Sequence, residues 1–226
     1  MRKRMSIYGD GTLHGKMHDD LGFRVTEASF SGSIYGKVFV IDDYLTEVEL
    51  ARIADMVPSE AEYADTYPNR SLWENFTYAG AFTKTQLLWD HWETVCEWTS
   101  DADVMHISGH NKFVYRSSEI DKPHMTRIRE RLQVSPAHMR EYKPHTDYGA
   151  KALTILVPIA PGVSEPTRFH GYNGGADVHN NTVRSVPWDI NQAYMFRPTL
   201  DHSYHSYIGG EADRYVLNIN FMFEQQ

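Results

Sequence analysis

The sequence predicts an α+β fold that is mainly β, with a largely antiparallel sheet core flanked by helices from the N-terminal part. Helical periodicity is found only before residue 134, strand-like segments follow residue 136, and no βαβ alternation links the two parts. No linker, internal repeat or low-complexity tract divides the 226 residues. A single domain over 1–226 is therefore the simplest organisation.

The N-terminal part supplies the predicted helices. Residues 1–36 are polar and without a period, so we interpret them as a mobile arm or a lid. Residues 37–134 are predicted to be mainly helical support behind a short apolar strand at Lys37–Ile41. Thr46 and Glu49 form the capping-box pair that is typical of a helix start. Helices are predicted over 46–57, 84–100 and 121–132.

The C-terminal part, residues 135–226, is predicted to form the β core. Strands are expected over 137–142, 152–159, 193–197, 202–207 and 214–223. Along the last segment an apolar or aromatic set (Tyr215, Leu217, Ile219, Phe221 and Phe223) alternates with a more polar set (Arg214, Val216, Asn218, Asn220 and Met222). We expect the apolar set to pack on the helices and the other set to face a polar, ligand-holding interior.

Composition and charge exclude several classes of protein. The chain carries 22 Lys and Arg against 30 Asp and Glu, a formal charge of -8, and no dense basic run, so a nucleic-acid partner is not expected. The basic N-terminus has no apolar stretch after it, which predicts neither a signal peptide nor a membrane anchor and favours a cytoplasmic location. The single cysteine, Cys96, excludes an internal disulfide and a cysteine-based zinc cluster.

Two residues just before an apolar strand are candidate metal ligands. His145 and Asp147 are two positions apart, so in extended chain both side chains point to the same side. The same spacing recurs at His18 and Asp20, because a chain with 12 histidines contains such a pair by chance. That second pair lies in the unpatterned arm with no strand after it, and we do not expect it to bind metal.

A third ligand is predicted in the segment after residue 201. His202 and His205 are three apart and would face opposite sides of a strand, so only one can point inward. We choose His205, with His202 as the alternative. Gly209 and Gly210 predict a hairpin that brings Arg214, nine residues on (214 − 205), beside the metal.

The predicted ligand set favours oxygen chemistry at iron. Two histidines and one carboxylate leave coordination positions open, as in iron(II) oxygenases, although zinc accepts the same ligands. A fixed arginine nearby suits a co-substrate that has a distal carboxylate. Two alternatives stay open: a cupin-like barrel that uses zinc or manganese for isomerisation or hydrolysis, and a barrel that serves only as a binding module.

These residues resemble the 2-oxoglutarate and iron(II)-dependent dioxygenases, the group that includes prolyl hydroxylases. The resemblance runs from Lys37 to Phe223 and rests on four motifs: KVFVIDDYLTEVEL at 37–50, His145-Thr146-Asp147, the spacing of His205 to Arg214, and Gly174-Gly175. It implies a double-stranded β-helix (jelly roll) core flanked by N-terminal helices.

The resemblance also implies roles for individual residues. His145, Asp147 and His205 would bind Fe(II), and Arg214 would hold the 5-carboxylate of 2-oxoglutarate. Tyr142 resembles a tyrosine that assists the co-substrate. Asn218 either contacts the co-substrate or satisfies backbone groups inside the barrel. The implied reaction consumes O2 and 2-oxoglutarate, releases succinate and CO2, and hydroxylates a substrate, with ascorbate as a reductant.

The substrate is not identified by the sequence. The segment 164–188 is long and polar, and it departs from the Gly-Gly-Glu-Leu motif that is common in the family. An amino acid, a peptidyl residue or a small metabolite is expected, and halogenation is not, because halogenating relatives lack the carboxylate that Asp147 supplies. Tyr148, Arg168 and Trp188 are expected around the pocket mouth, where solvated loop positions are the simplest interpretation.

Overall fold

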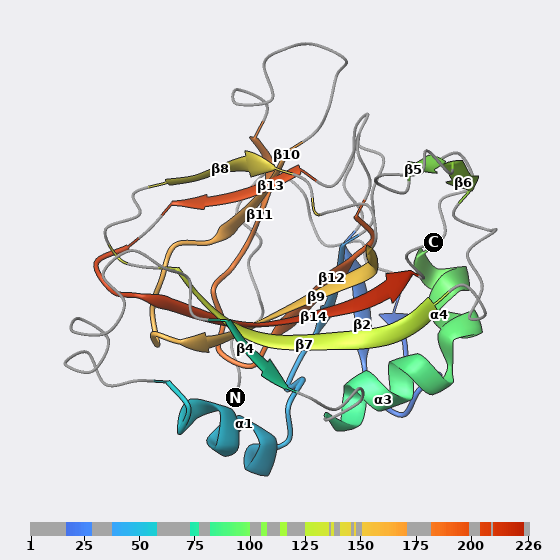
Figure 1. Ribbon diagram of the computed structural model, residues 1–226, viewed down its shortest axis with the longest axis horizontal. Helices are drawn as coiled ribbons and strands as arrows, with labels where there is room; N and C mark the ends of the chain where they lie inside the picture. The colour runs from blue at the N-terminus through green and yellow to red at the C-terminus, as the bar shows by residue number, and fades with distance from the viewer. Residues whose placement is uncertain are drawn as a thin grey trace.

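Two antiparallel sheets and three helices make up most of the described part of this computed structural model (Figure 1). The described residues are 17–28, 38–57, 73–76, 82–99, 105–107, 114–116, 125–135, 137, 141–145, 147, 151–170, 182–198, 204–208 and 210–223. Within these ranges no helix reaches the length and apolarity needed to cross a bilayer.

The larger sheet has eight strands in the order β1-β2-β3-β12-β9-β14-β7-β4. Their bounds are β1 Met17–His18, β2 Val25–Ala28, β3 Val38–Ile41, β4 Trp73–Phe76, β7 Met125–Ser135, β9 Lys151–Ala160, β12 Ala193–Phe196 and β14 Arg214–Phe223. The smaller sheet has the order β11-β10-β13-β8, with β8 Glu141–His145, β10 Thr167–His170, β11 Thr182–Val186 and β13 Tyr204–Ile208. A separate pair joins β5 Met105–Ile107 to β6 Val114–Arg116.

The C-terminal strands are shared between the two sheets. β7, β9, β12 and β14 belong to the larger sheet, whereas β8, β10, β11 and β13 belong to the smaller sheet. From β7 to β14 the chain therefore passes repeatedly from one sheet to the other. The predicted hairpin between His205 and Arg214 is therefore wrong. β13 pairs with β10 and β8, whereas β14 pairs with β7 and β9. The segment around Gly210 carries the chain from one sheet to the other, so the two residues lie on facing sheets.

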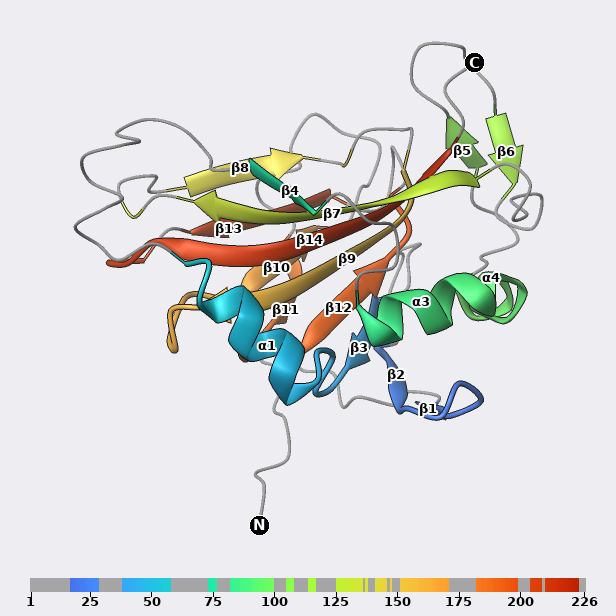
Figure 2. The same cartoon turned by 60° about the horizontal axis from the view of Figure 1, so that its bottom comes forward.

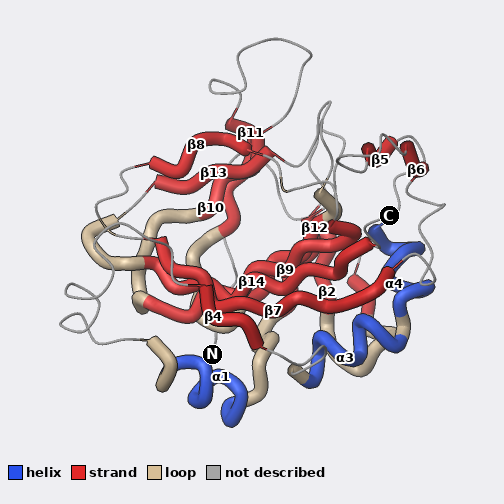
Figure 3. Tube along the Cα trace, viewed as in Figure 1, coloured by secondary structure: helices blue, strands red, loops and turns tan. Residues whose placement is uncertain are grey.

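The helices cover one face of the larger sheet, as Figures 2 and 3 show. They are α1 Glu47–Ala54, α3 Thr83–Asp90 and α4 Trp92–Thr99. The predicted capping box is present, since Thr46 and Glu49 each accept a hydrogen bond from the other's backbone N–H. The single helix predicted over 84–100 is two helices that meet at His91, whose backbone (φ -107, ψ 36) is not helical.

The main core lies between the helices and this sheet. As the alternation predicts, Leu217, Ile219 and Phe221 of β14 are fully buried there with Leu88 and other helix residues. The ring of Phe221 packs against Trp92 with centroids 5.4 Å apart. Each such side chain contributes roughly 1.5–3 kcal/mol through burial. The opposite face of β14 is thereby turned toward the smaller sheet.

The helix predicted over 121–132 is wrong, because residues 125–135 form strand β7. Ile128 and Leu132 are buried in the core and are four positions apart, a spacing that fits a helix and a strand equally well. The intervening Arg and Glu residues favour helix by propensity. Pairing with β14 along its whole length and with β4 on the other side overrides that local preference.

The N-terminal part is more strand-rich than the sequence predicts. Within the predicted arm or lid, residues 17–28 extend the edge of the larger sheet through β1 and β2, and residues 1–16 and 29–36 lie outside the described residues. His18 is buried, with its ring 4.7 Å from that of Trp98 and its Nε2 3.6 Å from Glu27 Oε2, while Asp20 is exposed. Residues 37–134, predicted to be mainly helical, also contain β3 to β7. Of these, β3 is the strand predicted at Lys37–Ile41. β4, β5 and β6 were missed because each has only three or four residues.

Glu49 ties α1 to the start of α3. Its carboxylate accepts hydrogen bonds from the backbone N–H of Thr46 (2.8 Å) and from the N–H and Oγ1 of Thr83 (2.7 and 2.8 Å). Burial raises the pKa of Glu49, but these hydrogen bonds together lower it below its ordinary 4.5. A carboxyl group with a lowered folded-state pKa stabilises the protein above its unfolded-state pKa, and this stabilisation is lost as pH falls through the folded-state value.

We therefore expect Glu49→Gln to lower the free energy of unfolding by about 1 kcal/mol at pH 7, since charge-assisted bonds are replaced by neutral ones. The variant should also lose less stability than the parent when the pH falls below 4.5, the ordinary value for this carboxyl group. Urea unfolding followed by circular dichroism at several pH values measures both effects. Glu47→Gln, an exposed acid of the same helical turn, is the matched control and should change little.

Candidate active site

A cavity of about 280 Å³ lies between the two sheets. The smaller sheet contributes His145, Thr167, His205 and Tyr207, and the larger sheet contributes Gln133, Tyr194, Arg214 and Asn218, among others. A small apolar cluster that includes Leu156, Phe169 and Phe196 packs between the sheets beside it. The cavity is therefore built from strands that are far apart in the sequence.

The structure brings His145, Asp147 and His205 together. One ligand atom from each lies within 4.8 Å of the others, the only such group found among the described residues. His145 at the end of β8 is the cross-strand partner of His205 in β13, and their rings are 4.3 Å apart. Atoms that share an ion at about 2.1 Å lie at most about 4.2 Å apart, so small side-chain rotations suffice for common ligation.

His205 is held against an apolar wall. Its side chain is buried, with ring centroids 5.9 Å from Phe169 and 5.2 Å from Phe196. These contacts fix the imidazole plane and keep water away from that side of the group. His202, the alternative ligand, lies outside the described residues.

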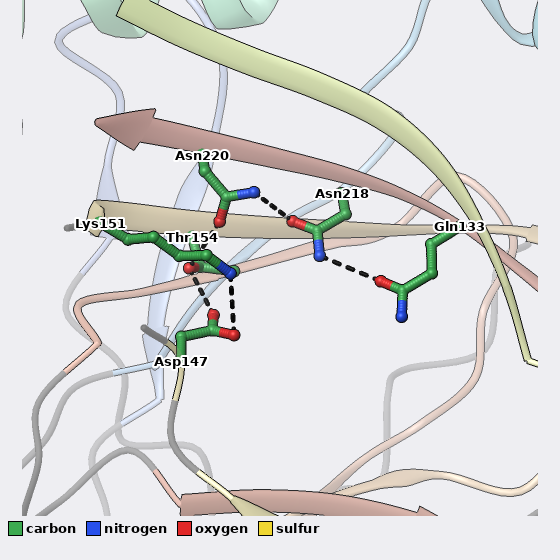
Figure 4. Close-up of polar contacts among 6 residues, drawn as sticks. All are labelled: Gln133, Asp147, Lys151, Thr154, Asn218 and Asn220. Atoms are coloured by element: carbon green, nitrogen blue, oxygen red, sulfur yellow. Dashed lines mark hydrogen bonds and ion pairs between the residues drawn. The ribbon is translucent and has the colours of Figure 1, made fainter. Parts of the chain in front are cut away.

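Asp147 is anchored through both carboxylate oxygens (Figure 4). Lys151 Nζ lies 2.9 Å from Oδ1, and Thr154 Oγ1 donates to Oδ2 at 2.7 Å. Burial raises the pKa of Asp147, but the charges of Lys151 and His205 and the hydrogen bond from Thr154 lower it in sum to about 2. The side chain is thus an anion at neutral pH and is oriented before any metal binds.

A row of three amides, Gln133, Asn218 and Asn220, continues from Thr154 across the cavity wall (Figure 4). Thr154 Oγ1 also lies 3.1 Å from Asn220 Oδ1, Asn220 Nδ2 donates to Asn218 Oδ1 at 2.7 Å, and Asn218 Nδ2 donates to Gln133 Oε1 at 3.2 Å. A threonine hydroxyl has one proton, so it serves Asp147 or Asn220 at one time. The amide row therefore links the orientation of Asp147 to side chains on β14 and β7.

Arg214 enters the cavity from the larger sheet as a buried cation. The Cζ atom of its guanidinium lies over the rings of Trp188 and Tyr207, 4.3 and 4.2 Å from their centroids. Nη2 donates to Thr167 Oγ1 at 3.3 Å, while Nε and Nη1 are buried without a hydrogen-bond partner among the described residues. Burial lowers the pKa of Arg214, an effect that Tyr194 and Tyr207 oppose. A buried cation with two open donors is costly unless an anion joins it.

Other predicted site residues have different outcomes. Asn218 lines the cavity, but its amide hydrogen bonds to Gln133 and Asn220, and contact with a co-substrate stays a prediction. Tyr142 lies on β8 opposite Tyr207, and its side chain is outside the described residues, as is Tyr148. Trp188 was wrongly interpreted as a solvated loop residue. It is 7% exposed and donates from Nε1 to the Pro161 carbonyl.

Sequence reasoning missed several residues of this site. Thr154 interrupts the apolar run of β9, and that isolated polar residue was the available signal. Lys151 gave a weaker signal, as a basic residue four positions after Asp147. Thr167 and Tyr194, whose hydroxyl groups lie 2.8 Å apart beside Arg214, come from different sheets. No sequence spacing could have paired them.

No family model matches the chain, and no curated protein matches it. Among solved structures, it is similar to a prolyl-4-hydroxylase from Pseudomonas putida, with a TM-score of 0.48, 11% identity, and coverage of 83% of this chain and 93% of the other. It is also similar to a prolyl hydroxylase from Trichoplax adhaerens in complex with a fragment of the hypoxia-inducible-factor oxygen degradation domain (TM-score 0.45, 11% identity, 82% and 83% covered). A third similar structure is the non-haem α-ketoglutarate-dependent epimerase SnoN of nogalamycin biosynthesis (TM-score 0.42, 13% identity, 82% of this chain and 78% of the other covered). These scores are all below 0.5, so the function proposed below rests on the residues of the chain itself.

Proposed function

We propose that this chain is an Fe(II)- and 2-oxoglutarate-dependent oxygenase that hydroxylates an amino acid, a peptidyl residue or a small metabolite. One observation carries the proposal. A single cavity contains a two-histidine, one-carboxylate cluster and, from the facing sheet, a buried arginine with two nitrogen atoms that have no hydrogen-bond partner in the described part of the chain. The ligand cluster suits a metal ion with open coordination positions, and the arginine suits a carboxylate.

The strand arrangement supports a double-stranded β-helix as the core. The eight strands from β7 to β14 divide equally between the two sheets, and the chain passes repeatedly from one sheet to the other. Two facing four-stranded layers made in this way are typical of a jelly roll. β1, β2, β3 and β4 then extend the edges of the larger layer.

The residues present fit both groups. His145, Asp147 and His205 would hold Fe(II) in the three-ligand arrangement that leaves positions for a chelating co-substrate and O2. When bound, the iron and 2-oxoglutarate supply the oxidising power for oxygen insertion, and 2-oxoglutarate is converted to succinate and CO2. Manganese or zinc in a cupin-like isomerase or hydrolase would use the same triad but would leave the buried charge of Arg214 without a purpose.

The protein's own residues bind and orient the co-substrate. Arg214 would pair with its distal carboxylate, because Nε and Nη1 have no hydrogen-bond partner within the described residues. The rings of Trp188 and Tyr207 pack against the guanidinium, which restricts the direction of its donors. The hydroxyl groups of Thr167 and Tyr194 lie beside it as further polar contacts.

Succinate formation tests the proposal. Protein loaded with Fe(II) should convert 2-oxoglutarate to succinate under air with ascorbate present, slowly alone and faster with a substrate. Calorimetry without oxygen should show that 2-oxoglutarate binds only to the metal-loaded form with high affinity. Absence of succinate with every candidate substrate, together with absence of 2-oxoglutarate binding, would favour the isomerase, the hydrolase or the binding module.

The role of Thr154 gives a separate prediction. Thr154→Val keeps the shape of this fully buried residue but removes the hydrogen bond to Asp147, so the affinity for Fe(II) should fall by about 10–100-fold. Thr154→Ser keeps the hydroxyl group and should retain most of the affinity for Fe(II). Anaerobic metal titration measures the effect. Thr85→Val, which breaks the buried contact between Thr85 and Tyr44 outside the cavity, should leave the metal affinity unchanged.

A further inference from the structure

Three arginines form a row on the cavity-facing side of β7. Arg127, Arg129 and Arg131 alternate with buried residues such as Ile128 and Leu132, which pack in the core under the helices. Alternate residues of a strand share a face, so the arginine row lies on the same side as Gln133 and Ser135 of the same strand. Both of the latter line the cavity.

The arginine row begins beside the candidate active site and leads away from it. Arg131 is the cross-strand partner of Asn218, and Arg129 is the partner of Asn220, which connects through Thr154 to Asp147. Beyond them, Arg127 is opposite Met222. Figures 1 and 2 both show that β7 extends past β8 and β13 of the smaller sheet, so its first part is not covered by those strands.

Like charges lie close together along the row. Side chains two apart on a strand are about 7 Å from each other, a distance at which like charges repel. Arg127 is exposed, Arg129 is half-buried, and neither makes an ion pair within the described residues. Burial, and then the charge of Arg127, lower the pKa of Arg129. Glu130 points to the opposite face, and Asp147 is already paired with Lys151.

The size of the cavity indicates that a substrate must extend outside it. At about 280 Å³ it lies just below the range of roughly 300–1,000 Å³ that is usual for small-molecule sites. Under the proposed function, on which this inference rests, a metal ion and 2-oxoglutarate occupy most of that space. The part of the substrate that does not react would then lie on the neighbouring surface, where the arginine row is.

We propose that the arginine row binds the acidic side chains of an extended peptide, and that the substrate is a residue of such an acidic peptide. An extended peptide places alternate side chains at the same repeat of about 7 Å, so carboxylates at every second position can pair with successive arginines. Nucleic acid fits less well, because the chain carries a net charge of -8 and the arginine row lies on a single strand.

Binding of a labelled peptide to the full-length protein, without iron or 2-oxoglutarate, tests this inference. The probe is a fluorescein-labelled Gly-Asp-Ala-Asp-Ala-Asp-Gly peptide, compared with the same peptide carrying Asn for Asp and with a labelled thymidine hexanucleotide. We expect fluorescence anisotropy to show binding of the Asp peptide that weakens with salt, and little binding of the other two.

The variant with both Arg127→Gln and Arg129→Gln should weaken binding of the Asp peptide about tenfold, as expected for two partly exposed ion pairs. Its matched control is Arg24→Gln with Arg52→Gln, which removes the same charge from exposed positions elsewhere and should not weaken binding. If the double variant does not fold, Arg127→Gln alone, at an exposed position, should still measurably lower the affinity for the Asp peptide.

Three results would overturn the inference: equal binding of the Asn peptide, unchanged affinity in the arginine variant, or stronger binding of the oligonucleotide that depends on the same arginines. None of them bears on succinate formation, since no metal or co-substrate is present in this assay. Conversely, a protein that binds the acidic peptide through the arginine row but forms no succinate would contradict the proposed oxygenase activity and retain the arginine row as a peptide-binding surface.

Discussion

His205→Ala is expected to abolish specific Fe(II) binding, with a loss of affinity well above the roughly 100-fold that removal of a partner outside the metal's own ligands can cause. The substitution deletes one of two nitrogen ligands and leaves a hole lined by Phe169 and Phe196. Anaerobic calorimetric titration with Fe(II) measures the loss, and succinate formation should disappear with it.

The matched control for this variant is His18→Ala. His18 is buried to a similar degree, 4% exposed against 6% for His205, and packs on Trp98 away from the cavity. It should lower the melting temperature without changing the affinity for Fe(II). If His205→Ala retains normal affinity while His202→Ala loses it, the third ligand is His202 and the assignment of the triad is wrong.

Arg214→Met is expected to weaken 2-oxoglutarate binding at least about 30-fold, because a buried charge-assisted pair is worth about 2 kcal/mol or more. Arg214→Lys should weaken 2-oxoglutarate binding nearly as much, since an ammonium group cannot present two parallel donors beside the rings of Trp188 and Tyr207. Calorimetry on the metal-loaded protein measures the affinity, and steady-state kinetics should show mainly a raised KM for 2-oxoglutarate.

The stability of Arg214→Met supplies a second readout. Without a bound anion, the parent protein buries a cation whose Nε and Nη1 have no partner among the described residues, so removal of the charge should leave the melting temperature unchanged or raise it. Arg197→Met is the control. Arg197 is also a buried arginine, which donates to Thr99 at 2.6 Å, and its loss should destabilise the fold without affecting 2-oxoglutarate. Unchanged 2-oxoglutarate affinity in Arg214→Met would contradict the proposed role.

Local patterns predicted the features that depend on neighbours in the sequence. The capping box of Thr46 and Glu49 is a contact between residues three apart, and the two faces of β14 follow from strict alternation. The positions of β9 and β12 followed from short apolar runs, because both strands lie at the centre of a sheet that is covered on both faces.

Long-range pairing decided what local patterns could not. The spacing of Ile128 and Leu132 fits two structures, and only the ladder with β14 makes β7 a strand. The turn at Gly209 and Gly210 favoured a hairpin by its residues, yet the strands on either side find their partners in different sheets. Trp188 gives no local sign that its ring lies on Arg214.

The sequence by itself determined the candidate ligands of the site: the His145 and Asp147 pair, a histidine near residue 205 and an arginine at 214. Only the tertiary structure decided how they meet, with the triad assembled by the ladder between β8 and β13 and the arginine reaching the cavity from the facing sheet. The physical reason is that side-chain chemistry and alternation are local properties of the chain. The pairing of strands depends instead on which faces can be buried together, and that is settled by the whole fold.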